Sequence, residues 1–232
     1  MGHIIERIAQ GRGHDVVCRI DIENQEAFDS EAFKGSDVAI EFTTPATAEG
    51  NVRRCLEAGV PVVSGTTGWT DAMEDVRQEC ERLGGAFMWS SNYSIGVALF
   101  RRLNECLTRM MNSQPQYSAC LEETHHIHKL DHPSGTAVTL ANDLVAASTR
   151  YDGWQERGKG ESVPDDILPV EHVRRGEVPG IHTIQWDSNV DAITITHSAK
   201  SREGFALGAV VAAEFLAGKK GCHDFSEVIQ FD

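Results

Sequence analysis

The chain has 232 residues, of which 41% are hydrophobic and 24% are charged, a composition that suits one globular unit or two small domains. Its formal net charge of -14 argues against a nucleic-acid-binding surface, because phosphate binding needs clustered Lys and Arg side chains. The sequence has neither a signal-peptide pattern nor an apolar run near the roughly 18 residues that a membrane span requires. We therefore expect a cytoplasmic protein with neither nucleic acid nor membrane as a partner.

The first part of the chain alternates between strand and helix patterns. Helices are predicted over residues 2–11, 43–59 and 69–84, and strands over 15–21, 38–42, 61–65 and 86–90. Thr70 is the expected N-cap of the third helix, and Gly84 is its expected stop. Such alternation predicts βαβ units, hence a Rossmann-like, mostly parallel sheet with helices on both faces. Sheets of this kind bind ligands at the carboxyl ends of their strands.

The pattern changes after a long amphipathic helix predicted over residues 94–112. A strand over 117–128, a helix over 135–148 and an antiparallel strand pair over 181–186 and 191–199 predict a second, α+β unit. The polar residues 150–179, rich in Gly and Pro, predict a long surface connection. The helix over 203–218 and the last turn, 225–231, are expected to return to the first unit. We therefore predict a dinucleotide-binding domain from 1–93 with 204–232, and a second domain over 94–203.

A dinucleotide-binding sheet usually carries the motif G-x-G-x-x-G between its first strand and first helix. Here only Gly2 stands at the start of the helix, and Asp21 follows about 20 residues later, where an acid binds the ribose in such folds. A glycine before a helix and an aspartate after a strand are commonplace. The economical interpretation is a chain that begins inside the motif, with the first strand apparently missing.

Two loops follow predicted strands directly. Gly65, Thr66 and Thr67 come after the strand over 61–65, and the segment Ser90-Ser91-Asn92-Tyr93 comes after the next strand. Each segment alone reads as an ordinary turn. Together they line one carboxyl edge of the predicted sheet, where a ligand could sit.

The segment ETHHIHKLDHPSGTAV, residues 123–138, concentrates four histidines and a lysine. A metal site is disfavoured, because on an extended strand His125 points to one face while His126 and His128 point to the other. Satisfied core or surface histidines are a second interpretation. The third, which we prefer, is a proton-donating pair, because His125 and Lys129 lie two same-face steps apart on a strand.

The turn after these residues resembles an anion cradle. Pro133 fixes the turn, and Ser134, Gly135 and Thr136 open a helix with free backbone N–H groups and two hydroxyls. Cofactor phosphates belong to the other domain, so a substrate carboxylate is the anion we expect here.

The segments HHIHK and PSGTA resemble 4-hydroxy-tetrahydrodipicolinate reductase, also called dihydrodipicolinate reductase. The segments DVAIEFTTPA, GTTGW, SSNYSIGV, GIHTI and SREGFALGAV follow the same order, so the resemblance spans nearly the whole chain. It implies an NAD(P)H-dependent oxidoreductase that reduces 4-hydroxy-tetrahydrodipicolinate to tetrahydrodipicolinate, in lysine biosynthesis through diaminopimelate. It also implies an active site in the cleft between the domains and a homotetramer formed through the sheet of the second domain.

The resemblance also implies roles for individual residues. His125 is the proton donor and acceptor, Lys129 is the second proton donor, and His126 contacts the substrate. Gly135 and Thr136 bind a substrate carboxylate, with Ser134 in support. The residues that it implies in cofactor binding are Asp21, Gly65, Thr66, Thr67, Ser90, Ser91, Asn92 and Tyr93. Gly2, the remaining glycine of the dinucleotide motif, is the further cofactor-binding candidate, and no metal is expected.

Two features depart from the family pattern. Most of the glycine motif is absent, and Asp21 is followed by Ile22 where a basic residue would help hold a 2′-phosphate, which favours NADH over NADPH. Two alternatives to the reductase therefore stay open. One is another two-domain Rossmann oxidoreductase acting on a carboxylated substrate, and the other is a truncated, noncatalytic relative that only binds a dicarboxylate.

Overall fold

The computed structural model describes residues 1–158 and 160–229. The chain forms two compact units: residues 1–95 with the segment from Glu203 onward make the first, and residues 96–202 make the second. Within the described residues, no helix is both long and apolar enough to cross a bilayer.

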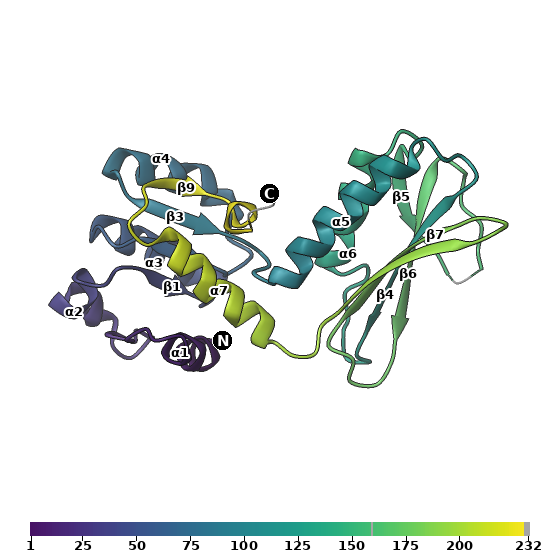
Figure 1. The fold of residues 1–232 in the computed structure, drawn as a ribbon. Helices are drawn as coiled ribbons and strands as arrows, with labels where there is room; N and C mark the ends of the chain where they lie inside the picture. Colours follow the sequence, from purple (N-terminus) through teal and green to yellow (C-terminus); the bar gives the residue numbers. More distant parts are fainter. Residues whose placement is uncertain (159, 230–232) are drawn as a thin grey trace. The chain divides into compact units, whose positions relative to one another are not determined.

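The first unit is built on a parallel sheet with the strand order β1-β2-β3-β9 (Figure 1). Its strands are β1 (Ala39–Glu41), β2 (Val62–Ser64), β3 (Ala86–Trp89) and β9 (Gly221–His223). The interior residues of β2 and β3 are almost fully buried, which is typical of a parallel sheet covered on both faces. This confirms the predicted Rossmann-like, parallel-sheet fold of the first unit.

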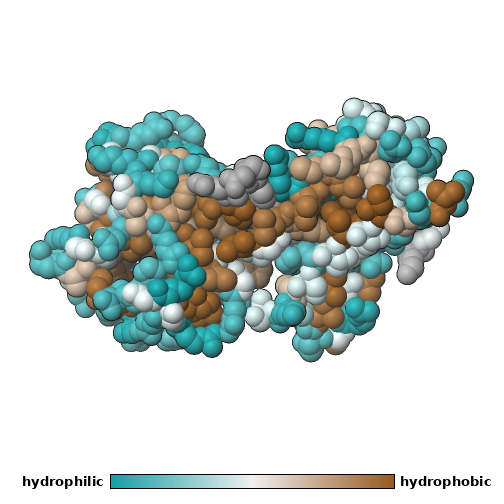
Figure 2. All heavy atoms as spheres, viewed as in Figure 1, coloured by the Kyte–Doolittle hydropathy of each residue, from teal (hydrophilic) through white to brown (hydrophobic). Residues whose placement is uncertain are grey.

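Helices cover this sheet, with α7 packed on β1, β2 and β3 and α1 packed on α7. The helices α3 and α4 pack on each other and on the sheet. Figure 2 shows hydrophilic residues over the outer side of α4, which leaves its apolar stripe for the core. The helical elements of this unit are α1 (Gly2–Gly11), η1 (Gln25–Asp29), α2 (Glu31–Lys34), α3 (Pro45–Glu57), η2 (Thr70–Ala72), α4 (Met73–Leu83), α7 (Glu203–Leu216) and η3 (Phe225–Val228).

Two local predictions for the first unit are wrong. Residues 15–21 form no strand, because they have no hydrogen-bonded partner strand within the described part of the chain; Cys18 and Ile20 still pack against the core. Thr70 does not cap α4, because it begins the short helix η2 and the N-cap position falls on Ala72. The stop at Gly84 is confirmed, with the left-handed φ of 62° that glycine adopts without steric cost.

The last turn packs within the first unit, as predicted. Phe225 contacts the ring of Tyr93, with centroids 4.9 Å apart. Residues 230 and 231 of the predicted segment lie outside the described residues.

The second unit is a mixed sheet in the order β5-β6-β4-β7-β8, with α5 and α6 packed on one face. The strands β5, β6 and β4 are parallel, and β7 pairs antiparallel with both β4 and β8. Its elements are α5 (Ile95–Met111), β4 (Ser118–His125), α6 (Gly135–Ala147), β5 (Gly153–Glu156), β6 (Ile167–Arg174), β7 (Ile181–Asp187) and β8 (Ala192–Ser198). The second unit is thus the predicted α+β fold.

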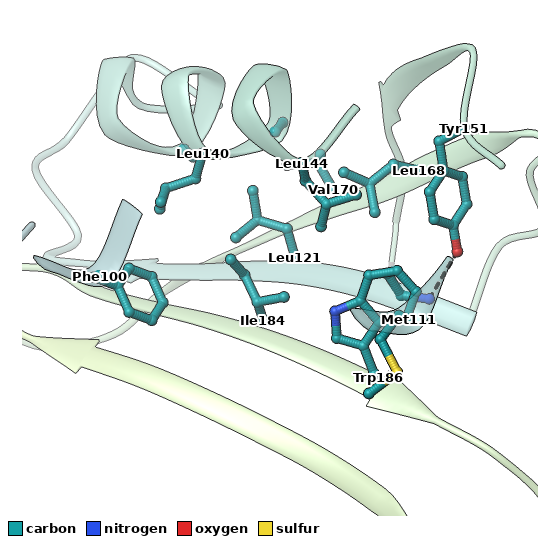
Figure 3. Close-up of a cluster of buried hydrophobic side chains, with 13 residues drawn as sticks. Phe100, Met111, Leu121, Leu140, Leu144, Tyr151, Leu168, Val170, Ile184 and Trp186 are labelled. Carbon is teal, nitrogen blue, oxygen red and sulfur yellow. Dashed lines mark hydrogen bonds between the residues drawn. The ribbon is translucent and has the colours of Figure 1, made fainter. Parts of the chain in front are cut away.

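The core of the second unit lies between the helices and this face of the sheet (Figure 3). Leu140 and Leu144 of α6 point toward Leu121, Leu168 and Val170 from the strands, and all five are almost fully excluded from water. Burial of each such side chain contributes roughly 1.5–3 kcal/mol relative to its exposed state. This packing fixes α6, and with it the segment before α6, on the sheet.

Two predictions for the second unit are corrected. Residues 150–179 are not a surface connection, because they contain β5 and β6, whose Leu168 and Val170 are buried in the core. The strand predicted over 117–128 ends at His125, where the chain turns. The sequence pattern did not predict β6, because the strand contains polar residues such as Glu171 and His172. Burial of its charged side chains depends on partners from other segments, which a local pattern does not contain.

Candidate active site

The first group of candidate residues surrounds a buried carboxylate at the end of β1. Glu41 is 6% exposed and accepts hydrogen bonds from Ser64 Oγ at 2.5 Å and Thr66 Oγ1 at 2.9 Å. Thr43 Oγ1 donates to the same carboxylate, and its backbone N–H donates to Thr66 Oγ1 at 2.8 Å. Glu41 therefore ties the loop after β1 to the loop after β2.

The loop Gly65-Thr66-Thr67 is held from both sides. Trp69 and Trp89 each donate an indole N–H to the carbonyl of Thr66, at 2.8 and 2.7 Å. At Gly65 an added Cβ would lie 2.2 Å from the ring of Phe42, so only glycine allows this close packing. A hollow of about 310 Å³ opens here, lined by Met1, Phe42, Thr43, Pro45, Gly65, Thr66 and Thr67.

The segment after β3 is also a tightly bonded turn. Ser90 Oγ donates to the carbonyl of Asn92 at 2.9 Å, and Asn92 Oδ1 accepts from the N–H of Ser94 at 2.8 Å. Tyr93 is 1% exposed and donates to the carbonyl of Ser64 at 2.9 Å, and this burial raises the pKa of its hydroxyl. The Tyr93 side chain therefore holds two loops together, and any cofactor contact by Tyr93 is left to its backbone.

The remaining residues predicted to bind cofactor lie at the surface. Gly2 is the first residue of α1 and is exposed, with open space where a Cβ would stand. Asp21 lies in an exposed turn, where its Oδ1 accepts the N–H of Glu23 at 2.8 Å. The expected position of Asp21 at the end of a strand is wrong, because residues 15–21 form no strand.

The second group of candidate residues surrounds Glu123, which is fully buried near the end of β4. The backbone N–H of Ser134 donates to both carboxylate oxygens of Glu123, at 3.2 and 3.1 Å. His125 Nδ1 lies 3.4 Å from Oε2, and Arg174 Nη1 lies 3.5 Å from Oε1. One carboxylate thus contacts the predicted proton donor, the predicted anion cradle and a cation.

His182 of β7 completes this cluster. Its Nε2 lies 3.8 Å from Glu123 Oε2 and 3.3 Å from Ser134 Oγ. Its ring meets that of His125 edge-on, with centroids 5.2 Å apart. The strand register explains the convergence, because Glu123 stands opposite His182 in the pairing of β4 with β7, and side chains of paired residues share a face.

Burial dominates the protonation of both imidazoles. Desolvation lowers the pKa of His125; Glu123 opposes this shift, whereas Lys129 and Arg174 add to it. Desolvation lowers the pKa of His182 further, to about 3, with His125 adding to the shift. His182 is therefore neutral at physiological pH, and the protonated form of His125 gives up its proton more readily than an exposed histidine.

Lys129 does not lie on β4, so its predicted same-face relation to His125 along a strand is wrong. The chain turns after His125, and Lys129 Nζ pairs with Asp131 at 2.7 Å. Its charge still contributes to lowering the pKa of His125. Arg174 holds this turn, because it donates to the carbonyl of Lys129 at 3.1 Å and to that of Asp131 at 2.7 Å.

The histidines that follow the strand are placed by the same turn. His128 is exposed and lies 3.0 Å from Glu177. His126 is partly buried, and its Nδ1 is buried without a hydrogen-bond partner. His125 is the last residue of β4, and His126 lies in the turn that follows. The strand alternation that was expected to point their side chains to opposite faces therefore does not apply.

The predicted anion cradle is the N-terminus of α6. Ser134 is the N-cap, and its Oγ accepts the N–H of Ala137 at 3.2 Å. Gly135 is exposed and Thr136 is partly buried, so the first turn of a helix of 13 residues is accessible to a ligand. Backbone N–H groups and the positive end of the helix dipole favour an anion at such a position.

Two groups of side chains within the described residues have ligand atoms that lie within 4.8 Å of one another, as metal binding requires. One is Glu123, His125 and His182, where Arg174 already compensates the carboxylate. The other is His132, Glu156 and His172. Reasoning along the histidine-rich segment alone missed both groups, because each group includes residues from segments distant in the chain.

Sequence reasoning also missed Glu123, Arg174, His182 and Glu41 as site residues. Glu123 carried a usable signal, since two residues before His125 on a strand is a same-face position. Arg174 and His182 carried none, because only the pairing of β4 with β6 and β7 brings them to His125.

The chain combines a Rossmann-like sheet, which has polar loops at its strand ends, with an α+β unit that holds a buried histidine-carboxylate cluster. The comparisons place it among the two-domain pyridine-nucleotide-dependent reductases. Family comparison matches residues 1–93 to "Dihydrodipicolinate reductase, N-terminus" and residues 96–229 to "Dihydrodipicolinate reductase, C-terminus". The chain belongs to the dihydrodipicolinate reductase family.

Individual relatives agree with this assignment. The 4-hydroxy-tetrahydrodipicolinate reductase of Christiangramia forsetii is 44% identical over 231 residues, which cover 99% of this chain and 93% of the relative. The reductase of the same name from Methanopyrus kandleri is 38% identical over 79% of this chain and 67% of its own length. Dipicolinate-bound dihydrodipicolinate reductase from Paenisporosarcina sp. TG-14 shares the fold, with a TM-score of 0.68, 22% identity, and coverage of 83% of this chain and 74% of that one.

Proposed function

We propose that this chain catalyses the NAD(P)H-dependent reduction of 4-hydroxy-tetrahydrodipicolinate to tetrahydrodipicolinate, with His125 as its principal proton donor. The family and the names of the relatives support the reaction. The observation that carries the assignment of His125 is its contact with buried Glu123, which also binds the start of the α6 anion cradle. The reaction adds a hydride and a proton and releases the hydroxyl as water.

The surroundings of His125 suit proton donation. Its ring is 9% exposed at the side chain, with Nδ1 toward Glu123. An added Cβ at Gly180 would lie 3.0 Å from Nε2, so glycine at this position keeps space beside that nitrogen. We propose that Nε2 delivers the proton while the negative charge of Glu123 stabilises the imidazolium.

Lys129 is the proposed second proton donor. It is held by Asp131 at 2.7 Å, on a turn that Arg174 fixes through two backbone carbonyls. An ammonium group next to the substrate would also attract the dicarboxylate before any proton moves.

The proposed substrate-binding residues are His126, Ser134, Gly135 and Thr136. A substrate carboxylate would accept N–H groups from the first turn of α6, with Gly135 and Thr136 nearest. Ser134 supports the site without binding the substrate itself, because its Oγ caps α6 and its backbone N–H donates to Glu123. The Nδ1 of His126 is buried without a hydrogen-bond partner, so the proposed contact of His126 with the substrate would be made by its other ring nitrogen.

The loops of the first unit suit a nicotinamide dinucleotide. The hollow beside Gly65, Thr66 and Thr67 lies at the carboxyl ends of parallel strands, where this fold binds dinucleotides. When bound, the nicotinamide supplies the hydride. We propose that this loop, residues 90–93 and Gly2 hold the dinucleotide, and that Asp21 favours NADH because its charge repels a 2′-phosphate.

Substitution of the proton donors tests these roles. His125→Ala and Lys129→Ala should each lower kcat by about 10²–10⁴-fold, the range of general acid catalysis, with unchanged NADH affinity. The measurement is oxidation of NADH, and separately NADPH, with substrate supplied by dihydrodipicolinate synthase. His128→Ala is the matched control, because His128 is exposed, pairs with Glu177 and has no proposed role in the reaction. Wild-type turnover in both test variants would refute the assigned roles.

We also propose a cytoplasmic homotetramer assembled through the sheet of the second unit. The face of this sheet opposite α6 is hollowed over about 490 Å³ and lined by polar residues such as Glu122, Thr183 and Gln185. The edge strand β8 is exposed along most of its length, which supports pairing with another copy. Light scattering after size exclusion should give four times the chain mass of 25.5 kDa, and Thr194→Pro in β8 should reduce it. A monomeric wild-type mass would refute the assembly.

A further inference from the structure

The second group of metal-ligand side chains lies beside the anion cradle and has no part in the proposed reaction. His132 belongs to the turn before α6, Glu156 ends β5, and His172 lies near the end of β6. His132 Nδ1 and His172 Nδ1 lie 2.7 and 2.6 Å from the same oxygen, Oε1 of Glu156. Three separate segments thus direct ligand atoms to one point.

One of these atoms has no hydrogen-bond partner. His172 Nδ1 is buried and makes no hydrogen bond of acceptable geometry, although it lies close to Glu156. His132 Nδ1 does form a hydrogen bond to the same oxygen. A cation between the three atoms would satisfy all of them, because it accepts a lone pair from each imidazole and compensates the carboxylate.

From this geometry we propose that His132, Glu156 and His172 form a binding site for a borderline divalent transition-metal ion, of which Zn²⁺ is the representative. Two imidazoles and one carboxylate are a ligand set that Zn²⁺ accepts in proteins, with water in the fourth position. The ion would bind through Nδ1 of both histidines and a carboxylate oxygen of Glu156.

The required rearrangement is small. Ligand atoms around a tetrahedral Zn²⁺ lie about 3.3 Å apart, given metal-ligand distances of about 2.0–2.2 Å, so the present contacts must open by roughly 0.6 Å. The two rings now stack with centroids 4.2 Å apart and planes 18° from parallel, and they must tilt to direct both nitrogens at the ion. The side chains of His132 and Glu156 are 47% and 27% exposed, which leaves room for these rotations.

The site differs from the buried cluster around Glu123 in its charge. The carboxylate of Glu123 already has a cationic partner, Arg174, at 3.5 Å. Both of its oxygens also accept a hydrogen bond from the backbone N–H of Ser134. At Glu156, the contacts recorded within the described residues are the two imidazoles. A bound ion would join the turn before α6 to two strands, and His132 stands two residues before the N-cap Ser134.

Calorimetric titration of the chelator-treated 232-residue chain with Zn²⁺ alone, at neutral pH, tests the proposal. We expect one ion per chain and at least about a tenfold loss of affinity in His172→Gln and in Glu156→Gln, since each removes one of three ligands. The matched control is His128→Gln, which removes an imidazole from another exposed His-Glu contact and should bind as the wild type does. Cys106→Ser removes the exposed thiol as a competing ligand.

Several results would overturn the proposal. One is the absence of stoichiometric Zn²⁺ binding to the wild type, and another is equal affinity in the wild type and both ligand variants. A third is loss of binding in His182→Gln alone, which would assign the ion to the buried cluster around Glu123. Glu156→Gln and the surface variant His132→Ala provide independent measurements if His172→Gln fails to fold by circular dichroism. Because neither substrate nor nucleotide is present, failure here leaves the proposed reaction untouched, and failure of the reaction leaves this site untouched.

Discussion

At the scale of single residues, the fully buried carboxylate of Glu123 is the group on which the candidate site depends. It contacts His125, Arg174 and the N–H of Ser134, so a change at Glu123 reaches the proposed proton donor and the proposed anion cradle together. Because its contacts are with these groups, we propose that Glu123 is a positioning residue.

We predict that Glu123→Gln lowers the pKa of His125, because the anion that opposes desolvation is removed. If catalysis uses the imidazolium, the alkaline limb of the pH profile of kcat/KM should move to lower pH. The glutamine oxygen can still accept from Ser134, which limits the structural damage. Steady-state kinetics across pH measure this shift.

Glu122→Gln is the control for this experiment, because successive residues on a strand point to opposite faces and Glu122 lines the other side of the sheet. It should leave the profile unchanged. An identical profile in Glu123→Gln would mean that Glu123 has only a structural role.

At the scale of elements, α7 is held to the first unit by a contact that only glycine permits. A Cβ at Gly208 would lie 1.6 Å from the carbonyl oxygen of Tyr93, in the loop after β3. A helix rich in small residues can therefore pack closely against the loop that is proposed to hold the cofactor.

We predict that Gly208→Ala destabilises the protein by at least about 2 kcal/mol, because the helix must move away from the loop. Gly204→Ala is the matched control in the same helix, where nothing lies within 4 Å of the added Cβ. The control should be neutral or more stable by up to about 1 kcal/mol, since alanine favours helix. Denaturant unfolding measures both, and equal stability of the two variants would contradict the close contact.

At the protein surface, charged side chains join the end of α1 to α7. Arg12 donates to both oxygens of Glu214, at 2.7 and 2.8 Å, and His14 Nε2 lies 2.7 Å from Oε1. The hydrogen bond from Arg12 is the main cause that lowers the pKa of Glu214 from 4.5 to about 2.

We predict that the ion pair between Arg12 and Glu214 stabilises the first unit above about pH 4.5 and that this stabilisation is lost as the pH falls toward 2. The folded protein holds Glu214 ionised through this window, whereas the unfolded chain takes up the proton, so acid shifts the equilibrium toward unfolding. Glu214→Gln should therefore reduce the loss of stability between pH 4.5 and 2, measured by thermal unfolding at each pH. An unchanged pH dependence would show that the pair contributes nothing.

At the scale of the whole molecule, the sheet of the second unit assembles an ionisable row from four strands. In the register, His172 of β6 faces Glu123 of β4, which faces His182 of β7, which in turn faces His197 of β8. Burial lowers the pKa of both His182 and His197. One face of the sheet thus carries the proposed catalytic histidine and, at its β5–β6 side, the proposed metal site.

The sequence by itself determined the elements whose signals are local. The βαβ alternation, the helix stop at Gly84, the helix start at Ser134-Gly135-Thr136 and the motif HHIHK with PSGT were sufficient for the Rossmann-like fold and for the family. These features depend on neighbouring residues, through backbone conformation, side-chain period and capping.

Only the tertiary structure decided the features that depend on partners distant in the chain. Residues 15–21 have a strand pattern and form no strand, whereas the polar β6 is a strand, because a strand exists only where another strand accepts its hydrogen bonds. For the same reason the sequence could nominate His125, and by its same-face spacing Glu123, but not Arg174 and His182 around them. Their convergence is set by the register of β4 with β6 and β7, which no local pattern contains.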